Sequence, residues 1–491
     1  MKTQATVELV FIPSPGMSHL VSAVEMAKQL VGRDDRLSIT VLIMKRPFDK
    51  SKVSSSTQSL LLTAADDRLK FVYLPLDEAA AAELQSKFPN NFMLEFIKMN
   101  KQHVRDHVRT MVSTGSTRIA GFIVDMFCTP MMDVAVEFGV PSYAFFTSNA
   151  TVLGLSFHLE SLSPDEYHDL TELKDSDAEL ELPGFVNSVP IKLLPVSFRD
   201  KEFGSRFMNI AKTFRQTRGI MVNTFEELES NAVRFLAEDD KVPPVYPVGP
   251  VIHLVNNTNE QEEEAMEIMK WLDNQPLSSV VFLCFGSMGS FGGDQLKEIA
   301  QALEQSSHRF LWSVRRPPSK GKGEIPGEYQ DLNEVLPKGF LERTKEIGKV
   351  IGWAPQVAIL SHKAVGGFVS HCGWNSTLES LWCGVPVATW PMHAEQQTNA
   401  FQLVRELRLA VDIKLDYRKD IYTSDSSNAM LVTAEEIENG IRKLMESENA
   451  CGEERKNRVK EMSEKSKVAV VEGGSSYSSI GLLIEDFMKT T

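Results

Sequence analysis

Short apolar runs alternate with amphipathic segments along the first half of the chain, and Pro, Gly or Ser often separates them. Val7–Ile12 predicts a buried strand, Pro13–Ser18 a turn, and the residues from about His19 to Leu30 a helix. Three further strands are expected, at Leu37–Ile43, Ala120–Asp125 and Pro141–Phe146. Strands that alternate with helices are typical of parallel sheets, so this half is predicted to be a doubly wound α/β domain.

The pattern breaks at Pro243–Pro250, where four prolines and Gly249 precede the polar run Asn256–Glu264. We expect an interdomain linker over 249–264. A second α/β half is then predicted. Its helices are expected at Met266–Leu272, Leu296–Leu303 and Asn375–Trp382, and its strands at Ser279–Gly286, Phe310–Val314, Lys349–Ile351, Gly366–Ser370 and Val385–Trp390. Arg315–Leu336 is expected to be a surface loop, and the tail predicts two amphipathic helices.

These two halves predict an α/β fold with two Rossmann-like domains that face each other across a cleft. Open parallel sheets bind ligands beyond the carboxyl ends of their strands, and interdomain clefts often bind small molecules. The predicted domains cover 1–248 and 265–473, and a C-terminal helix at about 474–491 is expected to pack back on the first domain.

Composition and charge limit the partners and the cellular location that are expected for this protein. The formal net charge of −14 argues against a nucleic-acid or anionic-membrane partner, because both require a basic surface. The five cysteines include no CxxC pair, which favours a reducing, cytoplasmic location. No stretch reaches the ~18 apolar residues of a membrane span, and the N-terminus lacks the pattern of a signal peptide.

The segment Trp353–Gln396 groups polar and aromatic residues around one predicted strand, turn and helix. The strand ends at Ser370, and the next helix begins near Asn375. The first N–H groups and the positive dipole end of a helix favour an anion. His371, Asn375 and Ser376 add side-chain donors, so a diphosphate fits here without Lys or Arg.

Both ends of this segment carry further residues that could contact a ligand. Trp353 offers a flat face for a base, and Glu395 beside Gln396 offers acceptors and donors to a polyhydroxylated ring. Ser376 and Glu379 also have the spacing of a capping box, which alone would mark only a helix start. No metal is expected at His371 and Cys372, because adjacent residues rarely bind one ion.

The order and spacing of these residues resemble the signature box of plant secondary-product glycosyltransferases, within the family 1 UDP-sugar-dependent enzymes. The resemblance runs from the Pro-Gly-x-x-His motif ending at His19 to the Glu-Gly-Gly-Ser-Ser run beginning at Glu472. The stretches FIPSPGMSHL, IVDMFC, VFLCFGSMG and FVSHCGWNSTLES are most similar to the subgroup that glucosylates flavonoids, other phenolics and some triterpenes. The resemblance implies a GT-B fold with an acceptor-binding first domain and a UDP-sugar-binding second domain.

The resemblance also implies roles for individual residues. Uracil would stack on Trp353 and pair with the backbone of Ala354, and the ribose would be held by Gln356 and Glu379. The diphosphate would be bound by His371, Asn375, Ser376 and Ser287, and the sugar by Trp374, Glu395, Gln396 and Thr147, with Ser18 also near the sugar. In the family, Gln at the last box position accompanies glucose and His accompanies galactose, so Gln396 favours glucose.

His19 is the candidate base because it follows a strand-to-helix turn, where a side chain faces the ligand. An acceptor hydroxyl must lose its proton as it attacks the anomeric carbon, and histidine has a suitable unperturbed pKa. The helix start should favour the neutral imidazole, and a carboxylate behind it should stabilise the charge that forms. Asp125, at the end of a predicted strand, is the candidate for that carboxylate, and the resemblance assigns both roles.

The expected reaction is a single displacement that converts the α-linked donor into a β-O-glucoside. Alignment of the two substrates and the helix start at Asn375 would supply much of the rate. UDP-glucose is then a co-substrate, and neither a metal nor another cofactor is expected; nothing in the sequence requires more than a monomer. Residues that could line the acceptor pocket, although each could equally be core, are Phe92, Met93, Phe127, Phe146 and His393.

Other functions fit less well. A nucleotide-dependent oxidoreductase would need G-x-G-x-x-G, and the run from Gly286 to Gly292 has the wrong spacing. The G-x-S-x-G motif of a serine hydrolase is absent, and His103 and His107 lie in a charged segment without HExxH. Transfer from another UDP-sugar and a non-catalytic UDP-sugar-binding protein stay open as alternatives, although the latter would be expected to lack His19 and Asp125.

Overall fold

The computed structural model describes residues 7–45, 47, 60–61, 64, 66–113, 118–174, 176–254, 262–318, 326–419, 430–446 and 450–489. The chain divides into two compact units. Unit 1 comprises Met1–Leu162, Ser205–His253 and Val468–Thr491, and unit 2 comprises Ser163–Gly204 and Leu254–Lys467. Residues 255–261 of the predicted linker lie outside the described residues.

Unit 1 is built on a seven-stranded, all-parallel sheet with the order β3-β2-β1-β4-β5-β8-β9. Its strands are β1 (Val7–Ile12), β2 (Leu37–Ile43), β3 (Leu69–Tyr73), β4 (Arg118–Asp125), β5 (Ser142–Phe146), β8 (Gly219–Val222) and β9 (Val245–Pro247). The central strands β1 and β5 are almost entirely buried, as expected where helices cover both faces of a parallel sheet.

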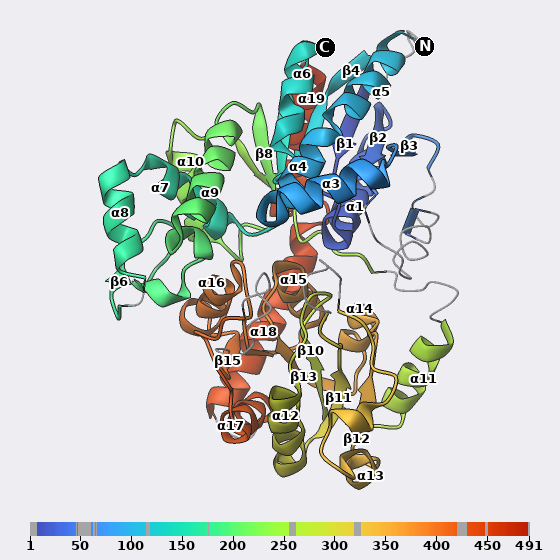
Figure 1. The fold of residues 1–491 in the computed structure, drawn as a ribbon, viewed down its shortest axis with the longest axis vertical. Coiled ribbons are helices and arrows are strands. Elements are labelled where there is room, and N and C mark those ends of the chain that lie inside the picture. The colour runs from blue at the N-terminus through green and yellow to red at the C-terminus, as the bar shows by residue number, and fades with distance from the viewer. Residues whose placement is uncertain are drawn as a thin grey trace. The chain divides into compact units, whose positions relative to one another are not determined.

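Helices cover both faces of this sheet (Figure 1). They are α1 (Met17–Arg33), α3 (Glu78–Lys87), α4 (Phe92–Met99), α5 (Lys101–Ser113), α6 (Met132–Glu137), α7 (Ala150–Ser161), α10 (Ser230–Glu238) and α19 (Ser475–Lys489), together with α9 (Lys201–Phe214), which crosses a unit boundary. Alternate residues of β1 enter different cores, because successive strand side chains point to opposite faces. Val10 lies in the core with α4, α5 and α7, and Phe11 lies in the core with α1 and α19.

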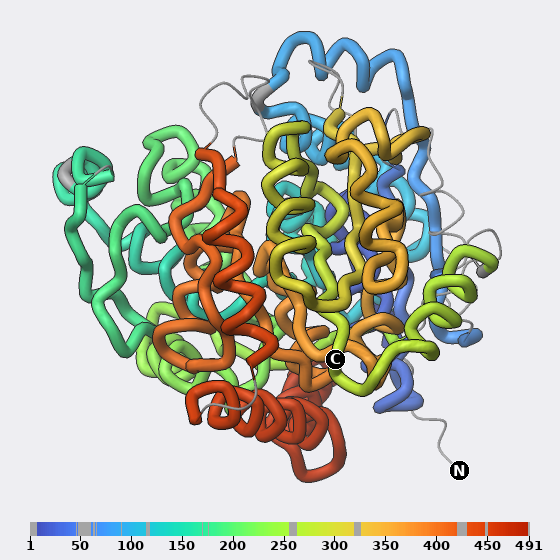
Figure 2. The backbone as a smooth tube through the Cα atoms, turned by 90° about the horizontal axis from the view of Figure 1, so that it is seen from below, coloured from blue at the N-terminus to red at the C-terminus, as the bar shows by residue number. Residues whose placement is uncertain are grey.

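Unit 2 is built on a six-stranded parallel sheet with the order β12-β11-β10-β13-β14-β15. Its strands are β10 (Val280–Cys284), β11 (Arg309–Ser313), β12 (Gly348–Ile351), β13 (Val365–Ser370), β14 (Val387–Thr389) and β15 (Ala410–Asp412). The unit's helices are α8 (Pro164–Glu172), α11 (Glu262–Asp273), α12 (Gly293–Ser306), α13 (Phe340–Thr344), α14 (Gln356–Leu360), α15 (Trp374–Cys383), α16 (Gln396–Phe401), the π-helix Gln402–Glu406, α17 (Ala434–Met445) and α18 (Ala450–Ala469), whose last two residues belong to unit 1. Helices α12 and α17 pack side by side over one face of the sheet (Figure 2).

The excursion Ser163–Gly204 comes between two parts of unit 1 in the sequence but packs in unit 2. It contains an antiparallel pair, β6 (Glu179–Leu180) and β7 (Val189–Pro190). Thr398 Oγ1 donates to the carbonyl of Leu193 at 2.9 Å, and the Glu406 carboxylate accepts the N–H of Val186 at 2.7 Å. These hydrogen bonds tie the excursion to α16 and to the π-helix that follows it.

Both sheets reverse their winding at one position, between β1 and β4 in unit 1 and between β10 and β13 in unit 2. Doubly wound sheets bind ligands beyond the carboxyl ends of the strands at such a switch point. The prediction of two parallel-sheet, Rossmann-like domains is confirmed by this topology and by the solved structures described below.

Candidate functional site

The switch point of unit 1 brings His19 and Asp125 together. His19 is the third residue of α1, which follows β1, and Asp125 is the last residue of the neighbouring β4. His19 Nδ1 lies 2.7 Å from Asp125 Oδ2. The Asp125 side chain is fully buried and that of His19 is 21% exposed. Asp125 Oδ1 accepts the backbone N–H of Phe127 at 3.0 Å, so both carboxylate oxygens have fixed partners.

Thr147 completes this cluster from the next strand, because it directly follows β5, which pairs with β4. Its hydroxyl lies 3.1 Å from His19 Nδ1 and 3.6 Å from the sulfur of Met126. When Asp125 accepts the Nδ1–H of a neutral imidazole, the basic lone pair is on Nε2. The arrangement therefore holds the ring in the tautomer that a general base requires.

The candidate acceptor residues of unit 1 fall into two groups. The Phe127 ring lies 5.4 Å from the His19 ring, centroid to centroid, and it is only partly buried. Phe92 and Met93, at the start of α4, are also partly buried and pack against the same core. Phe146 differs, because it is 1% exposed and packs edge-on against Phe214. Its side chain belongs to the core that α4, α5 and α7 form on one face of the sheet.

The starts of α14 and α15 bring together three of the predicted donor residues in unit 2. Gln356 Nε2 donates to Ser376 Oγ at 2.8 Å and to Glu379 Oε2 at 2.5 Å. The N-cap of α15 is Gly373, and no side chain caps it, so the capping-box interpretation of Ser376 and Glu379 is wrong. Both residues lie inside the helix, and each contacts Gln356. Burial raises the pKa of Glu379 to about 7.

The turn before α15 holds His371 between two glycines. A Cβ atom would lie 2.7 Å from His371 Nε2 if built on Gly286, and 2.6 Å if built on Gly373. Gly286 has a φ of +71°, which other residues rarely adopt. Within the described part of the chain, the buried Nδ1 of His371 has no hydrogen-bond partner, and burial lowers its pKa to about 3. A neutral donor at this helix start fits a phosphate oxygen.

The loop that follows β10 contains Ser287, which is exposed, and Ser290, which is buried. Lys419 Nζ donates to Ser290 Oγ at 3.1 Å, and its backbone N–H donates to the carbonyl of Met392 at 2.8 Å. Lys419 thus joins the Ser287 loop to the loop that precedes Gln396. Lys419 could not be predicted from the sequence, because nothing in its local pattern distinguishes it from a solvated lysine.

Gln396 holds the loop that precedes it. Its carbonyl oxygen accepts the N–H groups of Met392 at 2.9 Å and His393 at 3.1 Å. Its amide nitrogen lies 3.2 Å from His393 Nδ1, and burial, together with the charge of Lys419, lowers the pKa of His393 to about 4. Gln396 is 4% exposed, so its position is fixed by the turn. Trp353 and Ala354 follow β12 and are partly exposed, as are Asn375 and Glu395, whereas Trp374 is buried.

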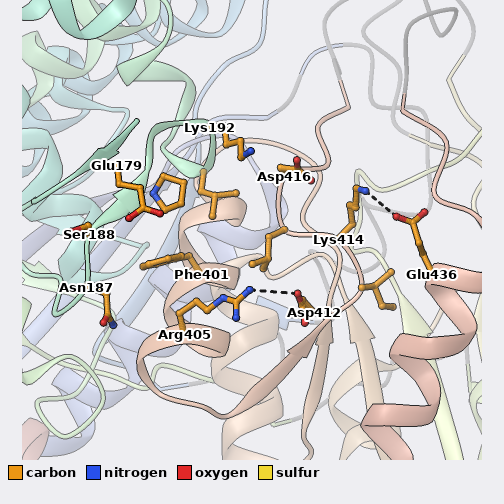
Figure 3. Close-up of a pocket in the computed structure, with 14 residues that line it drawn as sticks. Glu179, Asn187, Ser188, Lys192, Phe401, Arg405, Asp412, Lys414, Asp416 and Glu436 are labelled. Atoms are coloured by element: carbon orange, nitrogen blue, oxygen red, sulfur yellow. Dashed lines mark hydrogen bonds and ion pairs between the residues drawn. The ribbon is translucent and has the colours of Figure 1, made fainter. Parts of the chain in front are cut away.

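A separate pocket of about 670 Å³ lies within unit 2, between the excursion Ser163–Gly204 and the region of β15. Half of its lining residues are charged, and two of its ion pairs join Lys414 to Glu436 and Arg405 to Asp412 (Figure 3). No predicted site residue lines this pocket. The predicted donor residues Ser287, His371 and Ser376 instead follow β10 and β13, the two strands at the switch point.

Metal clusters and membrane-spanning helices are both absent from the described residues. No group of three or more His, Cys, Asp or Glu in this part of the chain could hold a metal ion. None of its helices is both long enough and apolar enough to cross a membrane.

Unit 1 thus brings a histidine into contact with a buried carboxylate, and unit 2 gathers Gln356, Ser376 and Glu379 at a helix start. Two Rossmann-like domains with these features define a nucleotide-sugar-dependent glycosyltransferase. Residues 188–431 match the family model described as UDP-glucoronosyl and UDP-glucosyl transferase.

Whole proteins of this family align with the chain over nearly its full length. It is 53% identical to UDP-glycosyltransferase 71E1 of Stevia rebaudiana, covering 99% of this chain and 100% of that protein. It is likewise 53% identical to UDP-glucose flavonoid 3-O-glucosyltransferase 6 of Fragaria ananassa, over 97% and 98% of the two chains. The crystal structure of Medicago truncatula UGT71G1 complexed with UDP-glucose superposes with a TM-score of 0.83 at 41% identity, covering 99% of each chain.

The chain therefore belongs to the UDP-glucoronosyl and UDP-glucosyl transferase family. It is an enzyme that takes its sugar from a UDP-sugar, and the predictions of the family and the enzyme class are confirmed. The roles of individual site residues stay predictions.

Proposed function

We propose that this enzyme transfers glucose from UDP-glucose to a hydroxyl of a small phenolic or terpenoid acceptor and inverts the anomeric centre to give a β-O-glucoside. The observation that carries this proposal is the 2.7 Å contact between His19 and the buried Asp125. A binding protein would have no use for a histidine held in one tautomer by a buried carboxylate. The Fragaria ananassa relative is named for UDP-glucose and a flavonoid, which supports the donor and the acceptor class.

In the proposed reaction, most acceptor contacts come from unit 1 and most donor contacts come from unit 2. Unit 1 binds the acceptor, whose hydroxyl gives its proton to His19 Nε2 as the oxygen attacks the anomeric carbon. Asp125 stabilises the imidazolium that forms. In unit 2, His371, Asn375, Ser376 and Ser287 bind the diphosphate as it leaves, and the dipole of α15 stabilises its charge. Phe92, Met93 and Phe127 are the proposed acceptor contacts in unit 1, and His393 is one in unit 2.

The remaining donor contacts follow the order of the segment. Trp353 stacks on uracil and the Ala354 backbone pairs with its edge, while Gln356 and Glu379 hold the ribose. Trp374, Glu395, Gln396 and Thr147 contact glucose. The short contacts of Gln356 with Ser376 and Glu379 support this assignment, because they gather ribose- and phosphate-type partners at one helix start. We propose that none of these steps uses a metal.

We also propose that the enzyme acts in the cytoplasm as a monomer. The five cysteines are all free thiols, three of them buried, which suits a reducing compartment. The proposed reaction takes every catalytic and binding residue from a single chain. Size-exclusion chromatography with light scattering tests the oligomeric state, and any assembly larger than one chain at micromolar concentration would overturn it.

Product mass spectrometry tests the function. Purified enzyme is incubated with UDP-glucose, EDTA and a panel of flavonoids, simple phenols and triterpenoids. We expect an acceptor to gain one hexose, and NMR of the product to show the β-anomer. His19→Ala should lose the product and keep UDP binding in a calorimetric titration. Product only with another UDP-sugar would replace the donor assignment, and UDP binding without any product would favour the binding-protein alternative.

A further inference from the structure

Glu229 is a buried carboxyl that the proposed reaction does not use. It is 5% exposed and lies just before α10, where it forms the N-cap residue of that helix. Its side chain faces another helix, because Glu229 Oε2 accepts the N–H of Ala150 at 2.9 Å and Oε1 accepts the N–H of Thr151 at 3.0 Å. The Thr151 hydroxyl adds a third hydrogen bond to Oε1 at 2.8 Å. A buried carboxyl without such partners would strongly destabilise the fold.

These hydrogen bonds fix the start of α7. Helices leave their first N–H groups unsatisfied, and here Glu229 takes two of them while the Asn149 side chain takes that of Val152 at 2.8 Å. Asn149, Ala150 and Thr151 are all fully buried. A helix start is usually stabilised by the N-cap side chain of the residue directly before it, which in α7 is Asn149. Glu229 adds an anchor that comes from 79 residues further along the chain.

The segment that Glu229 anchors begins at the candidate site. β5 ends at Phe146, and Thr147 and Ser148 lead directly to Asn149 at the cap of α7. Thr147 is therefore held on one side by the sheet and on the other by the anchored helix start. Its hydroxyl lies 3.1 Å from His19 Nδ1, the nitrogen that also contacts Asp125. A shift of α7 by a few tenths of an ångström would move this hydroxyl, because only two residues separate Thr147 from α7.

We propose that Glu229 is a positioning residue for glucosyl transfer, which acts by holding the start of α7 so that Thr147 keeps its place at His19 and at the sugar. The proposal rests on the proposed function, because it gives Thr147 a task only if His19 is the base. Glu229 contacts α7 at Ala150 and Thr151, so its effect on Thr147 passes through the backbone of residues 147–150.

A double-mutant cycle between Glu229 and Thr147 tests this coupling. Glu229→Gln keeps the size of the side chain but turns an amide nitrogen toward N–H donors. We expect kcat to fall about tenfold in the wild-type background and less than about twofold in a Thr147→Val background, because a residue acting through Thr147 has nothing left to position there. The KM for the acceptor should change little in either background. Glu166→Gln is the matched control, because Glu166 accepts the N–H of Ser163 at the start of α8.

Three results would overturn the proposal. If Glu229→Gln lowers kcat by the same factor in both backgrounds, Glu229 only stabilises unit 1, since a loss of folded protein affects both backgrounds alike. A normal kcat in a fully folded Glu229→Gln enzyme would remove the effect itself. An unchanged kcat in Thr147→Val would leave Glu229 without a target, although glucosyl transfer by the wild type would still stand. If Glu229→Gln does not fold, Thr151→Val takes its place in the same cycle, because it removes one hydrogen bond and keeps the shape of the side chain.

Discussion

Replacing Asp125 by Asn tests the proposed base directly. Asp125 Oδ1 accepts the N–H of Phe127, a backbone donor that cannot reverse its role. In the Asn variant the carbonyl oxygen must therefore occupy that side, and the amide nitrogen must face His19 Nδ1. Nδ1 then becomes the acceptor, which moves the proton to Nε2, the nitrogen that must take a proton from the acceptor.

The cost can be worked out from two terms. A hydrogen bond to a charged group contributes about 1.5–3 kcal/mol, and this support for the imidazolium is lost. To act as a base, His19 must return its proton to Nδ1. The Nδ1–H then faces the buried amide N–H of the variant side chain, and these two unpaired donors cost about 1–3 kcal/mol. At about 1.4 kcal/mol per tenfold, the sum predicts a loss of roughly 10²–10⁴-fold in kcat.

Initial rates with UDP-glucose and a weakly acidic phenol measure this loss. A nitrophenol that is already ionised at the assay pH should lose far less, because it needs no base. UDP affinity should not change, since the donor residues belong to unit 2. Asp133→Asn provides the control, because Asp133 has a 70% exposed side chain on α6. A folded Asp125→Asn enzyme that keeps more than a tenth of the wild-type kcat with the weakly acidic phenol would refute the base assignment.

Three further predictions concern unit 2. The raised pKa of Glu379, about 7, means that the folded protein holds a proton that the unfolded chain releases near pH 4.5, so stability falls as pH rises through this window. Glu379→Gln should remove this fall, raising stability at pH 8 by about 3 kcal/mol and not at pH 4, as thermal unfolding without ligand would record; equal melting temperatures of the wild type and the variant at pH 8 would contradict it. Gly286→Ala should weaken UDP binding by about tenfold in calorimetry, because its Cβ would meet His371 at 2.7 Å and its φ is +71°, whereas Gly292→Ala, with nothing within 4 Å, should bind normally. Gln396→His should reduce the preference for UDP-glucose over UDP-galactose in competition assays, because an imidazole has one acceptor nitrogen and cannot accept both loop N–H groups; an unchanged donor ratio would show that Gln396 does not select the sugar.

Local sequence patterns predicted most of the elements that carry the site. Leu37–Ile43 is a strand with the predicted bounds, and the helix expected over Asn375–Trp382 extends by one residue at each end. These segments are short-range features, set by apolar periodicity and by the glycines that flank them. Edge strands such as β3 and β9 were not predicted, because their apolar alternation is weak and partly exposed.

Residue type and spacing over a few turns of chain are enough to predict the fold class, the family and the residues of the signature segment. Which of these residues are in contact depends instead on how distant parts of the chain pack together. His19 and Asp125 are 106 residues apart and meet because β1 and β4 are neighbours at the switch point. Gln356 joins Ser376 and Glu379 across two helix starts, so two residues with capping-box spacing instead share a partner from another helix. Phe146 is buried in the core and Glu229 anchors α7, since the face of a strand and the partner of a buried carboxyl depend on packing between segments that are far apart in the chain.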